Sequence, residues 1–262
     1  MRERCAAFKL RSLHNEKMNS FIPITLFLLL IAASANAQTT NYSQTQVIIS
    51  NDGWELKGDL LLVESKTKTA IVLMLNKANG DRRSYEPLAQ LLAENNISSL
   101  RLDLRGHGES INKGKFIPFD SLNNSKINLD DTYTDIIAAH RYLFSIKQVD
   151  TNKIGMIGAS YSGEEMLISA RNFKKAKCYI AISPGSLSTE SIDSIDRYKA
   201  SMLFIKSMDE KSMQRFEEKV FASSKRAQIL IVSGKSHATD ILLTNPEISE
   251  LITDWLKRHL VK

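Results

Sequence analysis

The sequence predicts an α/β protein with a mostly parallel sheet and helices on both faces of that sheet. Short apolar runs, typical of buried strands, alternate along most of the 262-residue chain with segments of helical hydrophobic periodicity. Polar residues suited to catalysis follow several of the strand-like runs. Open parallel sheets gather their sites at the carboxyl ends of their strands, so both observations indicate the same architecture.

The first expected element is a hairpin, because residues 45–50 and 54–65 are strand-like and flank Asn51-Asp52-Gly53. Asp-Gly is a strong signal for a tight turn between two strands. Strands and helices alternate after it. The further expected strands are 70–76, 97–104, 153–158, 176–183, 202–207 and 228–233, and the expected helices are 84–95, 129–146, 164–173, 213–224 and 248–260.

The amino-terminal segment predicts an export signal rather than part of the fold. An apolar core from Phe21 to Ala33 precedes Ala35-Asn36-Ala37, the small-residue pattern of a signal-peptidase cut. We therefore expect residues 1–37 to be a signal peptide, with Met18 as a second possible start. A single domain would follow at 38–262, secreted or periplasmic and without stable membrane insertion. The alternative is an uncleaved amino-terminal anchor.

Composition excludes several other classes of protein. The formal net charge of +6 is partly carried by the predicted signal peptide, and the rest is too small and too dispersed to favour nucleic acid as a partner. Cys178 lies within an apolar strand and is expected to be a buried thiol, without an intrachain disulfide. No metal-binding cysteine or histidine motif is present, so neither a metal nor a cofactor is expected.

The most informative stretch is KIGMIGASYSG at 153–163. A strand ends at Gly158, Ser160 follows two residues later, and a helix begins directly after it. This is the context of a nucleophile elbow, in which small neighbours let the chain pass close to a strained serine. The usual pattern has glycine two residues after the serine, whereas this chain has Ser162. The alternative for Ser160 is a helix-capping serine.

Two further strand ends supply partners for such a serine. Asp209 follows the strand 202–207, and His237 follows the strand 228–233 after a Gly turn. A serine hydroxyl needs a base to take its proton, and a carboxylate fixes the orientation of a histidine base. We therefore predict Ser160 as nucleophile, His237 as base and Asp209 as acid, while Glu210 and Asp240 remain open as alternative acids.

These motifs resemble those of the α/β-hydrolase superfamily across nearly all of residues 44–260. The order serine, acid, histidine is the order of that family. LRLDLRGHGES at 100–110 also looks like the turn that follows the family's fourth strand. The chain looks most like small dienelactone-hydrolase-like and serine-aminopeptidase-like esterases. The resemblance implies an α/β-hydrolase fold, and residues 184–199 leave room only for a minimal lid.

The resemblance also implies an oxyanion hole made of backbone N–H groups. The residue after the nucleophile, Tyr161, would donate one of them. The family's third-strand loop, which usually begins His-Gly, would donate the other. This chain has Asn76 and Lys77 in those places, so the role passes by position to Ala78, with Lys77 next in line. The ammonium of Lys77 would either attract anionic substrates or turn out to water.

Three other residues are expected to be structural. The resemblance gives His107 a structural place in the turn after the fourth strand, and Asp103 and Arg105 are expected to form a buried pair that braces the loops. The long connection 106–128 is of a kind that is often functional in compact domains.

The sequence therefore predicts a serine hydrolase that cleaves a small carboxylic ester through an acyl-enzyme, without a cofactor. Thioester or short-peptide cleavage uses the same machinery and stays open. The alternative from another class is a non-catalytic binding protein with the hydrolase fold, which the altered loop at Asn76 and Lys77 motivates.

Overall fold

The computed structural model describes residues 40–118, 127–172, 176–185, 187–188, 191, 200–210, 220, 224 and 227–261. The predicted signal peptide at 1–37 lies outside these residues, as do most of the expected helix 213–224 and most of the expected lid 184–199. Within the described part of the chain, no helix is long and apolar enough to cross a membrane.

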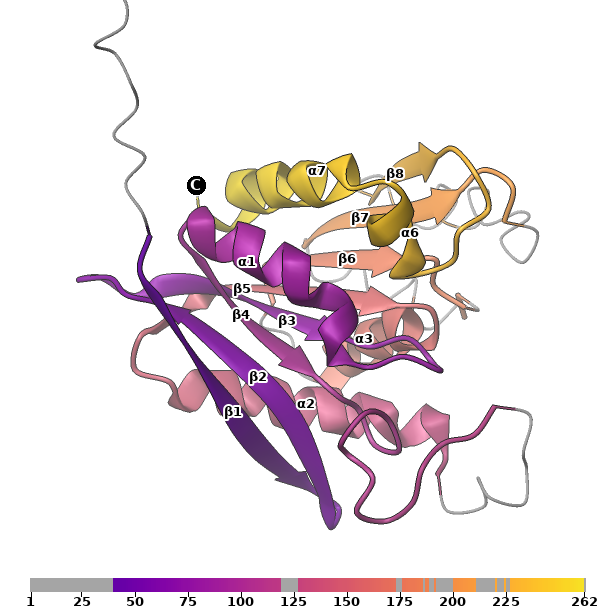
Figure 1. The fold of residues 1–262 in the computed structure, drawn as a ribbon, viewed down its shortest axis with the longest axis horizontal. Coiled ribbons are helices and arrows are strands. Elements are labelled where there is room, and N and C mark those ends of the chain that lie inside the picture. The colour runs from indigo at the N-terminus through magenta and orange to yellow at the C-terminus, as the bar shows by residue number, and fades with distance from the viewer. Residues whose placement is uncertain are drawn as a thin grey trace, which may run out of the picture. The chain divides into compact units, whose positions relative to one another are not determined.

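An eight-stranded sheet forms the centre of the domain, with the strand order β1-β2-β4-β3-β5-β6-β7-β8 (Figure 1). β1 and β2 form the expected antiparallel hairpin, and β2 also pairs antiparallel with β4. All remaining neighbours are parallel. The strands are β1 (Tyr42–Asn51), β2 (Trp54–Val63), β3 (Thr69–Leu75), β4 (Ile97–Leu102), β5 (Val149–Ala159), β6 (Cys178–Ile182), β7 (Ser201–Ser207) and β8 (Ala227–Val232). The predicted mostly parallel sheet is confirmed.

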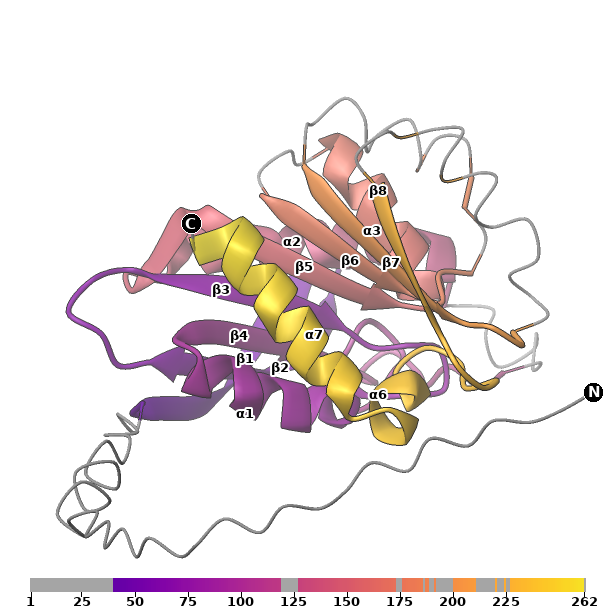
Figure 2. The same cartoon turned by 90° about the horizontal axis from the view of Figure 1, so that it is seen from above.

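Helices cover both faces of the sheet, as predicted. Figure 1 shows α1 and α7 on one face and α2 on the other, and Figure 2 shows α7 running across the strands. The elements are the 3₁₀ turn η2 (Arg82–Tyr85), α1 (Glu86–Glu94), the 3₁₀ turn η4 (Leu129–Asp131), α2 (Thr132–Ser145), α3 (Tyr161–Asn172), α6 (Asp240–Thr244), α7 (Glu247–Leu256) and the π turn η6 (Lys257–Val261). The short helix α6 had no counterpart in the sequence prediction.

Alternating side chains of the central strands feed two separate cores. In β3, Leu73 belongs to the core under α2 and α3, whereas Val72 and Met74 belong to the core under α1 and α7. Strands buried on both faces are apolar throughout, which is why the sequence shows continuous apolar runs there rather than alternation.

Two buried ion-pair groups hold the loops that follow β3 and β4. Arg82 contacts Asp103, Asp59 and Glu109, and Arg105 binds Asp135 of α2 at 2.7 Å. The prediction that Asp103 and Arg105 pair with each other is therefore wrong. Each braces a loop through another partner: Asp103 contacts Arg82, which follows the loop after β3, and Arg105 binds Asp135 of α2.

Candidate active site

Ser160 lies at a sharp turn between β5 and α3. Its φ is +56°, in the left-handed region that non-glycine residues rarely adopt. Its backbone N–H donates to Ile182 O at 2.9 Å, and its carbonyl accepts from Gly163 N at 3.0 Å. A Cβ at Gly158 would lie 2.6 Å from the carbonyl oxygen of Ser162, so only glycine fits at 158. These contacts hold the strained serine at the carboxyl end of the sheet.

Ser162, which replaces the usual glycine, has a specific structural place. Its buried Oγ accepts from Ala159 N at 2.9 Å and lies 3.1 Å from Leu75 O, which accepts the hydroxyl proton. The carbonyl of Ala159, at 2.9 Å, is a second acceptor for the same proton. Leu75 is the last residue of β3, directly before the loop 76–81. The hydroxyl thus ties the serine turn to that loop, which no glycine could do.

His237 follows β8 and lies between Ser160 and a carboxylate. Its Nε2 is 3.0 Å from Ser160 Oγ, and its Nδ1 contacts Glu210 Oε1. The side chain of His237 is 43% exposed, whereas that of Glu210 is buried. A carboxylate on Nδ1 favours the tautomer with the proton on that nitrogen, which leaves Nε2 free to accept from the serine hydroxyl.

The structure places Glu210, and not Asp209, against His237. Asp209 is exposed, and its backbone N–H donates to Gly234 O at 3.0 Å in the turn that follows β7. Adjacent residues of this turn direct their side chains to opposite sides, so only one of the two carboxylates faces the histidine. Our prediction of Asp209 as the acid is wrong in this geometry. Asp240 contacts Lys77 instead.

Glu210 is held by groups that the sequence analysis did not identify. Its second oxygen, Oε2, accepts from Ser183 Oγ at 2.8 Å and from Ser207 N at 3.4 Å. Ser207 Oγ also donates to Ser236 O at 2.6 Å, next to the histidine. Burial would raise the pKa of the Glu210 carboxyl, but hydrogen bonds from His237 and Ser183 outweigh it and hold that pKa below its usual value. Ser183 and Ser207 are the polar residues at the ends of β6 and β7, a position that could have identified them.

The backbone N–H groups expected to form an oxyanion hole belong to Tyr161 and Ala78. Tyr161 is the first residue of α3, and the first amides of a helix have no intrahelical acceptor. Ala78 lies in the loop after β3, where Asn79 takes the left-handed conformation at φ +65°. In the loops that the structure describes, neither amide donates to another backbone group.

Hydrogen bonds of its own residues hold the loop 76–81, which has Asn76 and Lys77 where the resemblance led us to expect His-Gly. Asn76 Oδ1 accepts from Leu104 N at 2.9 Å, and its Nδ2 donates to Lys77 O at 2.9 Å. Gly80 N donates to the same carbonyl at 3.1 Å. Asn76 therefore connects this loop by hydrogen bonds to the segment that follows β4.

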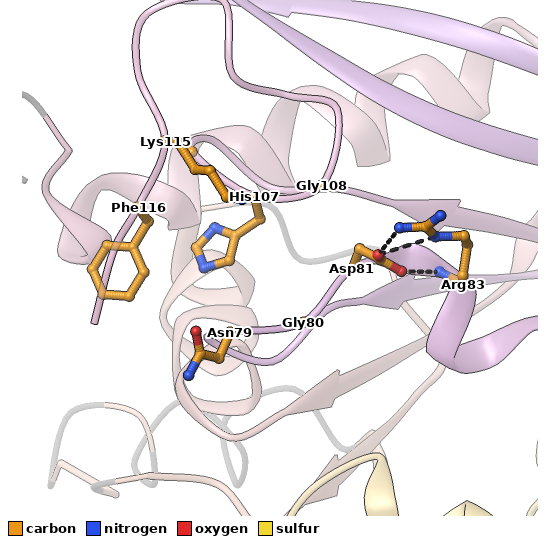
Figure 3. A pocket seen from close by; sticks show the side chains of 9 residues that line it. Asn79, Gly80, Asp81, Arg83, His107, Gly108, Lys115 and Phe116 are labelled. Carbon is orange, nitrogen blue, oxygen red and sulfur yellow. Dashed lines mark hydrogen bonds and ion pairs between the residues drawn. The ribbon is translucent and has the colours of Figure 1, made fainter.

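A cavity of about 250 Å³ opens beside this loop (Figure 3). His107 lines it and stacks between Phe116 and Tyr161, with ring centroids 5.3 and 5.5 Å apart. Burial lowers the pKa of His107, so its imidazole is neutral near neutral pH. The structural place expected for His107 is therefore consistent with its packing. The cavity is lined by Asn79, Gly80, Asp81, Arg83, Gly106, His107, Gly108, Lys115 and Phe116.

Within the described ranges, no group of three or more histidine, cysteine, aspartate or glutamate side chains is placed to hold a metal ion. Cys178 is buried in β6, and burial raises the pKa of its thiol well above the usual value.

Ser160, Glu210 and His237 follow β5, β7 and β8, and the imidazole contacts both the serine and the carboxylate. The chain is similar to α/β hydrolases, among them esterases and thioester hydrolases. Residues 137–244 match the family described as BAAT / Acyl-CoA thioester hydrolase C terminal. No curated protein matches the chain.

Solved structures support the same fold. Dienelactone hydrolase from Anabaena variabilis has a TM-score of 0.67 and 17% identity, covering 84% of this chain and 99% of its own. The α/β hydrolase GrgF from Penicillium sp. has a TM-score of 0.68 and 16% identity, covering 85% and 100%. Est1E from Butyrivibrio proteoclasticus has a TM-score of 0.64 and 16% identity, covering 83% and 99%. At these identities the likeness concerns the fold.

Proposed function

We propose that this protein is a serine hydrolase that cleaves small carboxylic esters, with Ser160 as nucleophile, His237 as base and Glu210 as acid. The observation that carries the proposal is the continuous hydrogen-bond chain from Ser160 Oγ through the imidazole to the Glu210 carboxylate. An unrelated serine cap at a strand–helix turn would not need a histidine and a buried carboxylate in line behind it.

The reaction follows from this geometry. Ser160 Oγ attacks the ester carbonyl carbon while its proton passes to His237 Nε2, and a tetrahedral oxyanion forms. His237 returns that proton to the departing alcohol as the carbon–oxygen bond of the ester breaks, which leaves an acyl-enzyme. Water then attacks the acyl carbon, gives its proton to Nε2, and releases the carboxylic acid as the proton returns to Ser160.

The ionised Glu210 carboxylate stabilises the imidazolium that forms in each half of this cycle. The amides of Tyr161 and Ala78 would donate to the oxyanion. These hydrogen bonds would stabilise its negative charge in the transition state without any group having to move.

A fluorophosphonate probe tests the proposal directly, because it reacts only with an activated serine. We expect the purified protein to be labelled at Ser160, and Ser160→Ala to abolish labelling and to lower p-nitrophenyl ester turnover by several orders of magnitude. A protein that is folded but neither labelled nor active on any short-chain ester would instead be a non-catalytic binding protein with this fold.

Thioester cleavage is the second candidate function. It is favoured by the match of residues 137–244 to an acyl-CoA thioester hydrolase family. The same three residues would serve both reactions, and the difference lies in the leaving group. Comparison of kcat/KM for an oxyester and a thioester with the same acyl chain decides between them.

We also propose that the enzyme acts outside the cytosol, on the basis of the predicted signal at 1–37. Intact-mass analysis of the protein recovered from its native host should then show a chain that begins at Gln38. A full-length chain in the cytosol would contradict the export proposal and leave the hydrolase proposal untouched.

A further inference from the structure

Lys77 belongs to the loop after β3, and its side chain reaches out of that loop. Lys77 Nζ lies 2.6 Å from Asp240 Oδ2. The lysine side chain is 17% exposed and the aspartate side chain is 50% exposed. The ammonium is therefore neutralised at the edge of the site, rather than directed freely into it or out to water.

Asp240 belongs to the turn that carries the histidine. Its backbone N–H donates to His237 O at 3.1 Å, and α6 begins at this residue. The ion pair therefore joins the loop that presents Ala78 to the loop that presents His237. These two loops are 163 residues apart in the sequence. The other fixed contacts of loop 76–81 lead elsewhere: Asn76 binds Leu104 N, and Arg82 N binds Asp103.

The lysine stem also fits its loop closely. A Cβ placed on Gly80 would lie 2.9 Å from Lys77 Cγ, so the stem crosses directly over that glycine. The absence of a side chain at residue 80 thus allows Lys77 to reach across to Asp240. This second observation, independent of the ion pair, indicates that the loop is shaped around the lysine.

A half-exposed ion pair contributes little to folding, because solvent screens it and both side chains lose rotamer freedom. The effect of the ion pair on the catalytic rate can be larger than its effect on folding stability. An oxyanion donor acts only when it lies about 2.7–3.1 Å from the developing charge, and small displacements are costly. A contact that fixes the distance between Ala78 N and His237 therefore affects the rate more than the stability.

We propose that the Lys77–Asp240 pair is a positioning latch, which holds the oxyanion loop in register with His237 during attack by Ser160. This proposal rests on the hydrolase function proposed above. It also predicts that Lys77 does not select anionic substrates, because Asp240 already neutralises its charge.

Two measurements test the latch: the rate constant for fluorophosphonate labelling of Ser160, and kcat and KM on a neutral p-nitrophenyl ester. The variants are Lys77→Met, Asp240→Asn, the double variant, and the exchanged pair Lys77→Asp with Asp240→Lys. We expect each single variant to lower both the labelling rate and kcat about tenfold, with KM within about twofold. The double variant should be no slower than either single variant, because both remove the same contact, and the exchanged pair should recover part of the rate.

Lys57→Met is the matched control. Lys57 forms a pair of similar exposure with Glu55 at 2.8 Å, on β2 and away from the serine. This variant should label at the wild-type rate, and thermal unfolding should show all variants folded.

The results separate failure of the latch from failure of the proposed function. If the wild-type protein is not labelled, the hydrolase function fails. If the wild-type protein is labelled and Lys77→Met labels equally fast, the latch is refuted alone. A loss in Asp240→Asn without a loss in Lys77→Met also refutes it, because Asp240 would then act independently of the lysine. A change in the ratio of kcat/KM between a neutral and a matched anionic ester in Lys77→Met would restore Lys77 to a role in substrate selection.

Discussion

Substitution of Glu210 by glutamine should reduce activity far more than substitution of its neighbour Asp209 by asparagine. Glu210→Gln keeps the size of the side chain and removes the negative charge beside His237 Nδ1. The imidazolium that forms during attack then has no counter-charge. The substitution therefore raises the barrier mainly through the transition state.

The size of this effect follows from the environment of the pair. Two unit charges about 4 Å apart interact by about 4 kcal/mol near a protein surface and by about 1 kcal/mol in bulk water. Glu210 is buried while the His237 side chain is 43% exposed, so the true value lies between these limits and nearer the first. Since about 1.4 kcal/mol corresponds to tenfold in rate, we expect kcat to fall by about 10²- to 10³-fold.

The assay is steady-state hydrolysis of a p-nitrophenyl ester, with fluorophosphonate labelling as a second measure. Asp209→Asn is the control and should stay within about twofold of wild type, because its exposed carboxylate does not contact the imidazole. Glu210→Asp withdraws the carboxylate by one methylene and should give an intermediate rate. Equal and small effects of both amide substitutions would refute our assignment of the acid.

Three further predictions concern stability. Ser162→Ala removes the acceptor of the buried Ala159 N–H and should lower the free energy of unfolding by about 1–3 kcal/mol in urea denaturation, whereas an unchanged midpoint would show that the hydroxyl is dispensable. Gly158→Ala should give little folded protein on expression, since its Cβ would meet backbone at 2.6 Å, and a wild-type melting curve would contradict that reasoning. Burial raises the pKa of Glu165 to about 8, so the folded state binds the proton more tightly than the unfolded state, and stability should be lost as the pH rises from about 4.5 to 8, by at most about 1.4 kcal/mol per pH unit. Glu165→Gln should remove that pH dependence, as measured by urea denaturation at several pH values.

The order of the elements could be predicted because apolar runs and helical periodicity are local signals. The same holds for Ser160, because the residues directly before and after it predict the strand and the helix on either side. The choice between Asp209 and Glu210 could not be made from the sequence. The choice depends on the side of a short turn to which each side chain points. A shift of the turn by one residue would bring Asp209, in place of Glu210, to the histidine.

The Lys77–Asp240 contact could not be predicted for a different reason. It joins two irregular loops that are distant in sequence, and no periodicity relates them. The sequence predicts a role for each residue separately, with Lys77 as a cation beside the pocket and Asp240 as an alternative acid. The fold pairs them with each other, which removes both of those roles.

The position of β8 determines how the site responds to partial unfolding. Ser160 follows β5, in the interior of the sheet, whereas His237 follows β8, which has one neighbour and is only partly buried. Edge segments with few buried contacts open at lower free energy than central strands. Fraying of this edge would separate the base from its nucleophile while the rest of the sheet stays intact. Hydrolysis should therefore be lost at lower urea concentrations than the secondary-structure signal in far-ultraviolet circular dichroism. The enzyme would then be inactivated before it is denatured.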